Sequence, residues 1–209
     1  VFGKKELIGN WGFTNVTKNW NWKDADQKPV QVAVFSNGDE VELIQNGTTV
    51  GKLTSGTRLA AELPHSFLFD LTYLPGTLEA VSYKDGKEIS RDTLVTTGPA
   101  KELRLIQEKK ELSANGHEVA YIRVEIVDEN GIVVPDAALR LSAAVEGVGS
   151  LAAFGSSNPI TDENYTSGTF TSYHGTATAI IRSGYQTGMC ILTVGCEGLD
   201  EKKIAFTIK

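Results

Sequence analysis

Apolar and polar residues alternate along two short segments near the start of the chain. Valines occupy every second position of residues 30–35, and valine and leucine alternate with glutamates in residues 40–43. This period of two turns one face of each β-strand towards a core. The turn-forming Ser-Asn-Gly-Asp sequence of residues 36–39 separates the segments, and Asn46-Gly47 then favours a type I′ hairpin, whose central residues need positive φ. We therefore predict a compact β-meander over residues 29–51.

Further strands with the same period follow in the first hundred residues, and no segment shows the period of a helix. The predicted strands span residues 57–62, 67–71, 78–83 and 88–97, with a hairpin turn at Lys84-Asp85-Gly86-Lys87. Proline cannot donate to a sheet ladder, so Thr97-Gly98-Pro99-Ala100 marks a domain boundary. About six strands without a helix predict a β-sandwich.

The second half of the chain repeats the β pattern with about seven strands. These strands are predicted at residues 103–107, 119–128, 138–145, 148–154, 174–182, 190–196 and 204–208. We expect a polar connection at residues 111–116 and a long loop at residues 155–173, and loops of that length are usually functional, docked on a neighbour or mobile. The strand number is typical of an immunoglobulin-like sandwich, although the Cys–Trp–Cys spacing of antibody domains is missing.

Two domains are also what a chain of 209 residues predicts, since each is long enough to bury its own core. We predict an all-β fold of two tandem immunoglobulin-like β-sandwich domains. Residues 29–97 form the first domain, and residues 98–209 form the second, which is of the bacterial, invasin-like type. Residues 1–28 are an irregular Trp- and Asn-rich segment that packs on the first domain or on a neighbour missing from this sequence.

Composition excludes several classes of function. The net charge of −6 and the pI near 5.2 argue against a nucleic-acid partner, which requires clustered Lys and Arg. No apolar segment approaches the roughly 20 residues of a transmembrane helix, and the N-terminus lacks the pattern of a signal peptide. We therefore expect neither a nucleic acid nor a membrane as a partner. A first residue of Val1 rather than Met suggests a mature product or an excised fragment.

Catalytic and metal-binding patterns are missing from the sequence as well. The acidic residues that could form a glycosidase pair stand either in turns, as Asp128 does, or at outward strand positions, as Glu125 does. The three histidines are isolated from other metal-ligand types, and Cys190 and Cys196 would lie about 20 Å apart on one strand, too far for a disulfide. We accordingly predict no catalytic residue, no metal site and no cofactor in this chain.

The tryptophans are the candidate ligand-binding residues. All three, Trp11, Trp20 and Trp22, fall in residues 1–28. An indole ring combines a large apolar face with an N–H donor, so Trp20 and Trp22 could stack on a sugar. If they stood in a strand, they would share a face and form one platform. The alternative is that both rings pack against a sheet or a neighbouring domain, which would leave nothing to bind.

A series of motifs runs through nearly the whole chain. They are Asn19-Trp20-Asn21-Trp22, the segments at residues 32–51, 75–81, 99–106 and 112–137, and YHGTATAIIRSG through LTVGCEGL at residues 173–199. Their order and spacing together resemble the C-terminal β-sandwich region of bacterial glycoside hydrolase family 2, the β-galactosidase-like group. The sequence departs from that pattern within residues 155–173, where Ser156-Ser157-Asn158-Pro159 replaces an Asn-Gly-Asp-Pro-like turn.

The resemblance implies an accessory role. In that family a sugar-binding jelly roll, a sandwich and the catalytic TIM barrel come first, and the barrel carries the acid/base and nucleophile glutamates. Neither glutamate maps onto this chain. We therefore expect the fragment to be inactive by itself and to support or space the barrel of a retaining, β-galactosidase-like parent enzyme of carbohydrate metabolism. Its partners would be the catalytic and sugar-binding domains of that parent chain, and an oligosaccharide is a further candidate.

Two alternatives stay open at this point. The first is a carbohydrate-binding module that uses exposed Trp20 and Trp22. The second is an adhesive pair of immunoglobulin-like modules, against which the sequence argues because it contains no internal repeat. For the location, we expect a periplasmic or secreted bacterial protein in preference to a cytoplasmic one.

Overall fold

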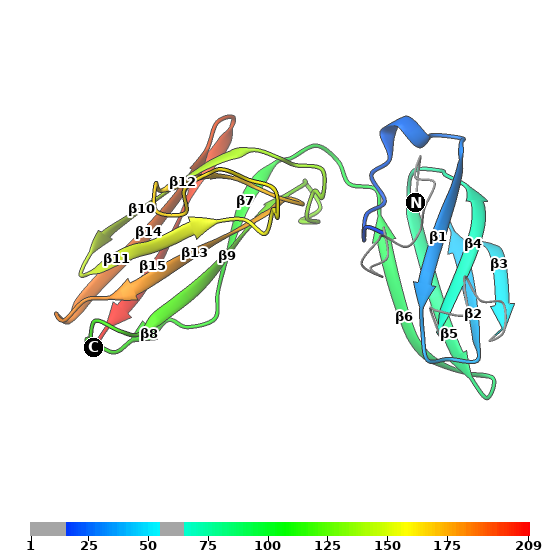
Figure 1. Cartoon of the computed structure of the whole chain (residues 1–209), viewed down its shortest axis with the longest axis horizontal. Helices are drawn as coiled ribbons and strands as arrows, with labels where there is room; N and C mark the ends of the chain where they lie inside the picture. Colours follow the sequence, from blue (N-terminus) through cyan, green and yellow to red (C-terminus); the bar gives the residue numbers. More distant parts are fainter. Residues whose placement is uncertain (1–15, 55–64) are drawn as a thin grey trace. The chain divides into compact units, whose positions relative to one another are not determined.

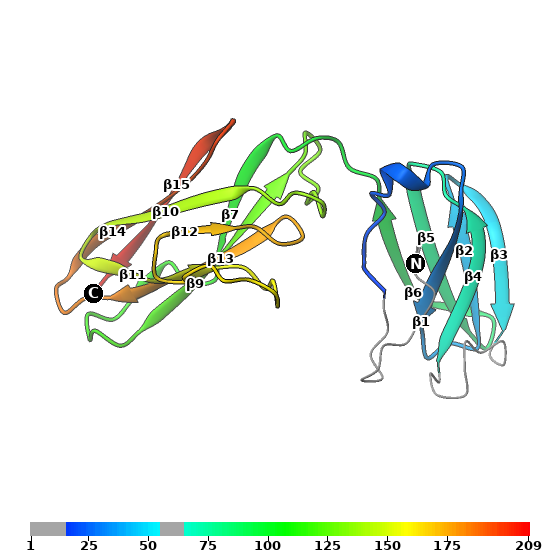
Figure 2. The same cartoon turned by 45° about the horizontal axis from the view of Figure 1, so that its top comes forward.

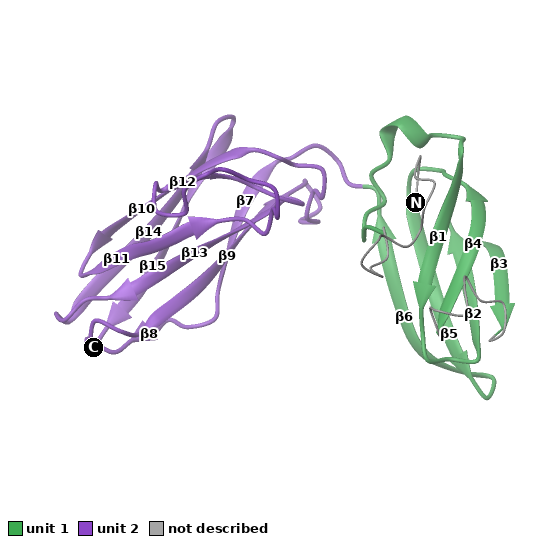
Figure 3. Ribbon diagram, in the orientation of Figure 1, with its two compact units in different colours: residues 1–96 green, residues 97–209 purple. Residues whose placement is uncertain are grey.

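The computed structural model describes residues 16–54 and 65–209. Trp11 and the strand predicted at residues 57–62 lie outside the described residues. The chain divides into two compact units, Val1–Thr96 and Thr97–Lys209, which Figure 3 colours separately. Regular structure in the described residues is β-sheet apart from one 3-10 helix, η1 (Lys23–Ala25), so the all-β prediction is confirmed.

Unit 1 is a sandwich of two unequal sheets (Figure 1). Its described strands are β1 (Pro29–Phe35), β2 (Glu40–Gln45), β3 (Thr48–Thr54), β4 (Ser66–Thr72), β5 (Thr77–Lys84) and β6 (Lys87–Val95). Strands β3, β2, β5 and β6 form a four-stranded antiparallel sheet in that order, while β1 and β4 form a two-stranded sheet. The sheets face each other, because Val30 and Phe67 of the smaller sheet share one core cluster with Val41 and Leu43 of the larger.

Both predicted hairpin turns of unit 1 are confirmed. Asn46 and Gly47 have φ values of 50° and 78°, and Asp85 and Gly86 have φ values of 51° and 73°. Two successive residues with positive φ match the right-handed twist of the flanking strands, which is why Asn-Gly and Asp-Gly occur here. These turns join β2 to β3 and β5 to β6.

The predicted meander is wrong at its first turn. β1 pairs with β4, with Val30 opposite Leu71, and does not pair with β2. Neither Asn37 nor Gly38 has the positive φ of a primed turn. Residues 36–39 instead carry the chain from one sheet to the other, where Asp39 N donates to the carbonyl oxygen of Tyr83 on β5 (2.8 Å). The period of two determines which face of a strand is buried but leaves its neighbour undetermined.

Unit 2 contains one sheet of five strands and one of four, which Figure 2 shows from a second angle. Its strands are β7 (Glu102–Gln107), β8 (Glu111–Leu112), β9 (Val119–Val127), β10 (Arg140–Gly147), β11 (Gly149–Gly155), β12 (Thr169–Thr171), β13 (Thr176–Ser183), β14 (Gly188–Cys196) and β15 (Leu199–Ile208). One sheet has the order β12-β10-β14-β15-β8, and the other has the order β11-β13-β9-β7. The prediction of a second β-sandwich is therefore confirmed.

The inner faces of these sheets form one continuous core. Ile122, Val124 and Ile126 of β9 are fully buried, as the alternation in the sequence predicts. Glu125, predicted on the outer face of the same strand, is only 5% exposed. It is covered because the guanidinium groups of its neighbours Arg104 (2.6 Å) and Arg123 (2.8 Å) both pair with its carboxylate.

Two segments predicted as connections contain short strands. Within residues 111–116, β8 pairs in parallel with the end of β15, and this position buries the side chain of Leu112. Within residues 155–173, β12 pairs with β10. The carboxylate of Glu163 holds the remaining loop, since it accepts the backbone N–H of Thr171 (3.1 Å) and pairs with Arg140. Pairing with distant residues leaves no periodic trace in the local sequence, which is why both strands were missed.

Candidate functional site

Trp20 lies in the core of unit 1. Its side chain is 3% exposed, and its Nε1–H donates to the carbonyl oxygen of Leu74 (3.3 Å). The indole packs against the ring of Tyr73, with 4.7 Å between ring centroids and 58° between ring planes. Because its apolar surface and its donor are both occupied, this ring is not available to stack on a sugar. The expectation of an exposed Trp20 is thus corrected to a buried one.

The backbone around Trp20 is fixed by a hydrogen-bond cluster. Its carbonyl oxygen accepts from the Tyr73 hydroxyl (2.8 Å) and from Thr96 Oγ1 (2.7 Å). The backbone N–H of Trp22 donates to the same tyrosine hydroxyl (3.3 Å). A buried polar cluster of this kind holds its members in one arrangement, since breaking any bond leaves a partner unsatisfied. The Asn-Trp-Asn-Trp motif is therefore tied to two parts of unit 1 that are distant from it in sequence.

Trp22 has a different environment. It is half-buried, lies outside any strand, and donates its Nε1–H to the carbonyl oxygen of Asn19 (2.9 Å). It also contributes to the lining of a cavity. The two indoles do not share a strand face, so they do not form the single exposed platform considered from the sequence.

The cavity has a volume of about 360 Å³ and belongs wholly to unit 1. Its described lining comes from residues 16–20 with Trp22, from β1 with Ser36, and from β2, β5 and β6. Apolar side chains of Val32, Leu78 and Leu94 lie among the lining residues. Cavities that bind small molecules typically have volumes of about 300–1,000 Å³ and a mainly apolar lining with a few polar groups.

Polar groups gather on the β6 side of this cavity. Asp92 is the one carboxylate among its described lining residues, and it pairs with Lys18 (2.8 Å). The hydroxyls of Ser36 and Ser82 are in hydrogen-bond contact, and Ser90 lies opposite Ser82 on β6. A single carboxylate beside hydroxyls can hydrogen-bond a polar ligand, but it cannot supply the two carboxyl groups of a glycosidase.

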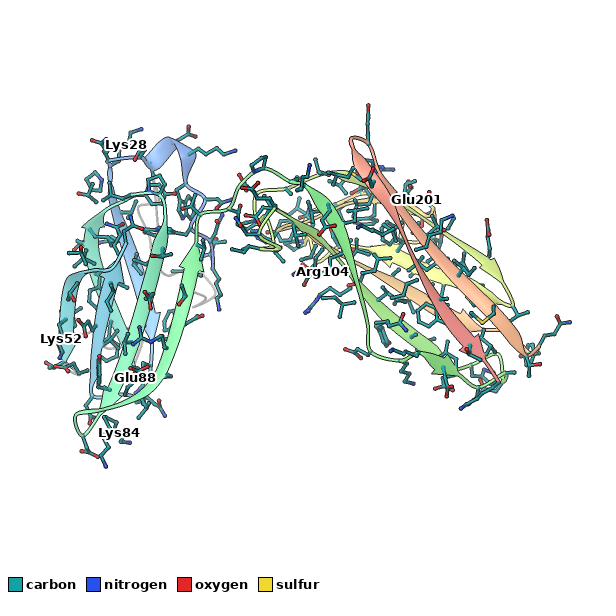
Figure 4. The ribbon with its side chains drawn as sticks, turned by 180° about the vertical axis from the view of Figure 1, so that it is seen from behind. Lys28, Lys52, Lys84, Glu88, Arg104 and Glu201 are labelled. Atoms are coloured by element: carbon teal, nitrogen blue, oxygen red, sulfur yellow. The ribbon has the colours of Figure 1, made fainter. Side chains whose placement is uncertain are left out.

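The outer face of the four-stranded sheet carries a network of charged side chains (Figure 4). Arg91 pairs with Glu88 (3.1 Å) and Glu79 (2.8 Å), and Lys52 pairs with Glu40 (2.8 Å). The hydrogen bonds to Glu88 and Glu79 hold the pKa of the Arg91 guanidinium above its ordinary value. Because these charges already pair with one another, the network is typical of a solvent-facing sheet and not of a reaction centre.

Asp128 is an acidic residue of unit 2 whose role is structural, because its carboxylate binds backbone N–H groups. It is buried, and its carboxylate accepts the backbone N–H groups of Asn130 (2.9 Å), Ile132 (2.9 Å) and Gly98 (3.0 Å). Burial by itself would raise the pKa of this carboxyl, yet the three hydrogen bonds lower it below its ordinary value. The interpretation of Asp128 as a turn residue is confirmed.

No group of three or more His, Cys, Asp or Glu side chains within residues 16–54 and 65–209 could hold a metal ion. Over the same residues, no helix is long and apolar enough to span a membrane. Cys190 and Cys196 are both free thiols. Burial raises the pKa of each thiol, which favours the protonated form.

Two models of known domain families match parts of this chain. Residues 103–205 match the glycoside hydrolase family 2 C-terminal domain 5, and residues 27–90 match a domain family of unknown function, DUF4982. The chain is thus similar to the C-terminal region of glycoside hydrolase family 2, and the match to this family's own domain lies in unit 2. The resemblance drawn from the sequence motifs is therefore confirmed.

Relatives of this family 2 region are enzymes of greater length. The chain is 27% identical over 181 residues to β-galactosidase BoGH2A of Bacteroides ovatus, covering 87% of this chain and 21% of that protein. It is 33% identical over 144 residues to a β-galactosidase of Thermoanaerobacter pseudethanolicus, covering 64% of this chain and 19% of that protein. The chain thus spans about a fifth of the length of these curated relatives.

A solved structure supports the same assignment. A glycosyl hydrolase family 2 member from Bacteroides cellulosilyticus superposes with a TM-score of 0.89 at 29% identity, covering 96% of this chain and 26% of that one. A β-glycosidase from Bacteroides vulgatus gives a TM-score of 0.81 at 26% identity, covering 91% and 24%. Both structures therefore share the β-sandwich fold of the described residues.

Sequence reasoning missed several residues that shape the site. Tyr73 and Thr96 were not singled out, because nothing local in the sequence shows that they meet the Asn-Trp-Asn-Trp motif. Ser90 and Asp92 could have been recognised, since they occupy alternate positions of a strand where a sandwich usually places apolar side chains. Polar residues on an inward strand face are a signal for a hydrated or ligand-binding interior.

Proposed function

We propose that this family 2 region is a non-catalytic accessory part of a β-galactosidase-like glycoside hydrolase. The observation that carries the proposal is the cavity of unit 1, which has one carboxylate among its described lining residues. A retaining glycosidase needs two carboxyl groups about 5–5.5 Å apart across the scissile bond. The charged side chains on the outer face of the sheet pair with one another, and Asp128 is committed to backbone N–H groups.

The similarity to longer β-galactosidases supports a place within a larger chain. In this proposal the partners are the catalytic and sugar-binding domains of the same parent chain, which would be a retaining enzyme of carbohydrate metabolism. Two sandwiches with buried cores can support and space a barrel because they keep their shape while presenting outer sheet faces to it.

Two assays test this proposal together. The purified 209-residue chain should show no hydrolysis of 4-nitrophenyl β-D-galactopyranoside. The full-length enzyme that carries this region should lose thermal half-life when the region is deleted, because its contacts with the other domains are removed. Turnover that co-purifies with the chain alone, or a deletion that leaves the half-life unchanged, would contradict the proposal.

A second candidate function is carbohydrate binding. One observation favours it: Trp22 lines the cavity of unit 1, beside polar side chains. The burial of Trp20 removes half of the pair on which this function was first considered. Calorimetric titration with galactosides and plant oligosaccharides, comparing the wild type with Trp22→Ala, separates this function from a purely supporting one.

A further inference from the structure

We propose that the cavity of unit 1 is a binding site for a neutral saccharide, with Trp22, Ser90 and Asp92 as the residues that contact it. The proposal locates the ligand between the two sheets instead of on an exposed aromatic platform. It rests on the proposed function only for the class of ligand, because a region of a glycosidase works among sugars. The shape and chemistry of the cavity come from unit 1 alone.

Among the described residues, the two sheets of unit 1 are of unequal size, and the cavity lies between them. β1 and β4 form a two-stranded sheet that faces a sheet of four strands. Ser90 and Asp92 of β6 lie opposite Ser82 and Ala80 of β5, and all four residues line the cavity. Both β6 residues are exposed. The β6 side of the cavity is therefore polar and open to solvent, so a polar ligand can reach these two side chains from outside.

A pyranose fits this mixture of groups. Its ring has an apolar C–H surface and several hydroxyls, which act as both donors and acceptors. The cavity offers apolar side chains such as Val32 and Leu94, together with the indole of Trp22. The carboxylate of Asp92 can accept two ligand hydroxyls in charge-assisted hydrogen bonds, and Ser90 can donate or accept. A purely apolar ligand would cover the exposed Ser90 and Asp92 side chains without offering either of them a hydrogen bond.

Charge within the cavity favours a neutral ligand over an acidic one. Lys18 and Arg91 are the two basic residues among the described lining residues. Lys18 pairs with Asp92 (2.8 Å), and Arg91 pairs with Glu79 (2.8 Å) and Glu88 (3.1 Å). A uronic acid would bring its carboxylate close to Asp92 and find each of these cations already compensated.

The exposed Lys18–Asp92 pair also marks a route by which a ligand can enter the cavity. The two side chains are 70% and 67% exposed, so their ion pair is weak and water can replace either partner. A saccharide hydroxyl can hydrogen-bond to the exposed carboxylate of Asp92 in place of water while the Lys18 ammonium stays paired with it. Lys18 then stays near the entrance, attached through a segment that Trp20 anchors in the core.

Nuclear magnetic resonance of the 209-residue chain tests the proposal directly. Titration with methyl β-D-galactopyranoside should shift the amide signals of Ser36, Ser82 and Ser90 and the indole N–H signal of Trp22. The expected dissociation constant is millimolar, as is usual for one sugar unit held by few hydrogen bonds. Signals of unit 2 should not move.

A matched pair of variants separates the cavity from the rest of the strand. Ser90→Phe places a ring in the cavity and should abolish the shifts, whereas Thr93→Phe places the same ring on the opposite face of β6 and should leave them unchanged. Both positions are exposed, so neither ring displaces core side chains. Asp92→Asn, which keeps the shape, should weaken binding about tenfold by removing charge-assisted bonds.

Several outcomes would overturn the inference. These are an absence of shifts in the wild type, equal shifts in Ser90→Phe, and tighter binding of methyl β-D-glucuronide than of the galactoside. If Ser90→Phe does not fold, Asp92→Asn decides, and unchanged affinity there excludes the assigned role of Asp92. The accessory function is tested separately, because the thermal half-life of the full-length enzyme does not depend on an occupied cavity.

Discussion

The two units are both β-sandwiches, but their sheets contain different numbers of described strands. In unit 2, sheets of five and four strands face each other, and twenty buried residues form one cluster. In the described part of unit 1, two strands face four, and nine buried residues form the corresponding cluster beside a cavity of about 360 Å³. Sheets of similar width cover each other and leave a core, whereas a narrow sheet over a wide one leaves an interior that a ligand can enter.

The distribution of tryptophan allows the stabilities of the two units to be measured separately. All three tryptophans precede Thr97, so they belong to unit 1, and the sequence of unit 2 contains none. Tryptophan fluorescence therefore reports unfolding of unit 1. Amide hydrogen exchange along β9 reports the stability of unit 2. The free energies of unfolding of the two units can be followed in one sample.

The largest effect is expected from truncating the core of unit 2. Phe154 is fully buried, so Phe154→Ala should lower the free energy of unfolding of unit 2 by about 3–5 kcal/mol, the cost of lost burial plus a cavity. Phe35→Ala in unit 1 is the matched control, because the Phe35 side chain is 51% exposed and should contribute little. Exchange along β9 should accelerate while the tryptophan transition stays in place. A joint shift of both reporters would show that the units do not unfold separately.

A smaller loss of stability is expected when the Asp128 carboxylate, which stabilises the turn after β9, is removed. Asp128→Ala leaves three backbone N–H groups, including that of Gly98, without their acceptor. The expected cost is about 1–3 kcal/mol in unit 2. Glu129→Ala, at an exposed position of the same turn, is the control and should change stability little. Urea denaturation followed by exchange along β9 measures both variants, and equal costs would contradict the assigned role of Asp128.

Acid should destabilise unit 2 over a defined interval. The hydrogen bond from Lys109 and then the backbone N–H of Ser113 lower the pKa of Glu118 from 4.5 to about 2. A group with a lowered folded-state pKa adds stability that is complete above its unfolded value and is lost as the pH falls through its folded value. Unit 2 should therefore lose stability between about pH 4.5 and pH 2. Glu118→Gln should flatten this dependence, and a parallel pH profile in the variant would rule out Glu118 as its source.

Local sequence patterns predicted most strands and both Asn-Gly and Asp-Gly hairpins, because these depend on neighbouring residues. They failed where pairing partners are distant. The valines of β1 alternate correctly, but the choice of β4 over β2 depends on how residues 36–39 cross between sheets. The parallel pairing of β8 with β15 joins residues almost a hundred positions apart, and no periodicity records it.

At the candidate site, too, local sequence patterns fail where the interacting residues are distant in sequence. The sequence identified Trp20 and Trp22 by residue type, which does not distinguish a buried indole from an exposed one. The difference depends on Tyr73 and Thr96, whose hydroxyls meet the Trp20 carbonyl from 53 and 76 positions away. Ser90 and Asp92 are polar at alternate positions of one strand, which the sequence shows, but the cavity that they line follows only from the arrangement of the sheets.

The smallest expected effect gives the sharpest test of the difference between the two interiors. Ala80 of β5 lines the cavity of unit 1, and Ala179 of β13 is fully buried in the core of unit 2. A change to Val adds the same two methyl groups at both positions and suits a strand. Ala179→Val should cost about 1–3 kcal/mol because the extra atoms overfill a packed core. Ala80→Val should change the free energy of unfolding of unit 1 by no more than about 0.5 kcal/mol, since the added atoms enter open space. Fluorescence for Ala80→Val and exchange along β9 for Ala179→Val provide the two values. A cost at Ala80 as large as that at Ala179 would mean that the space beside β5 is already filled, and the contrast between an open and a closed sandwich would then be lost.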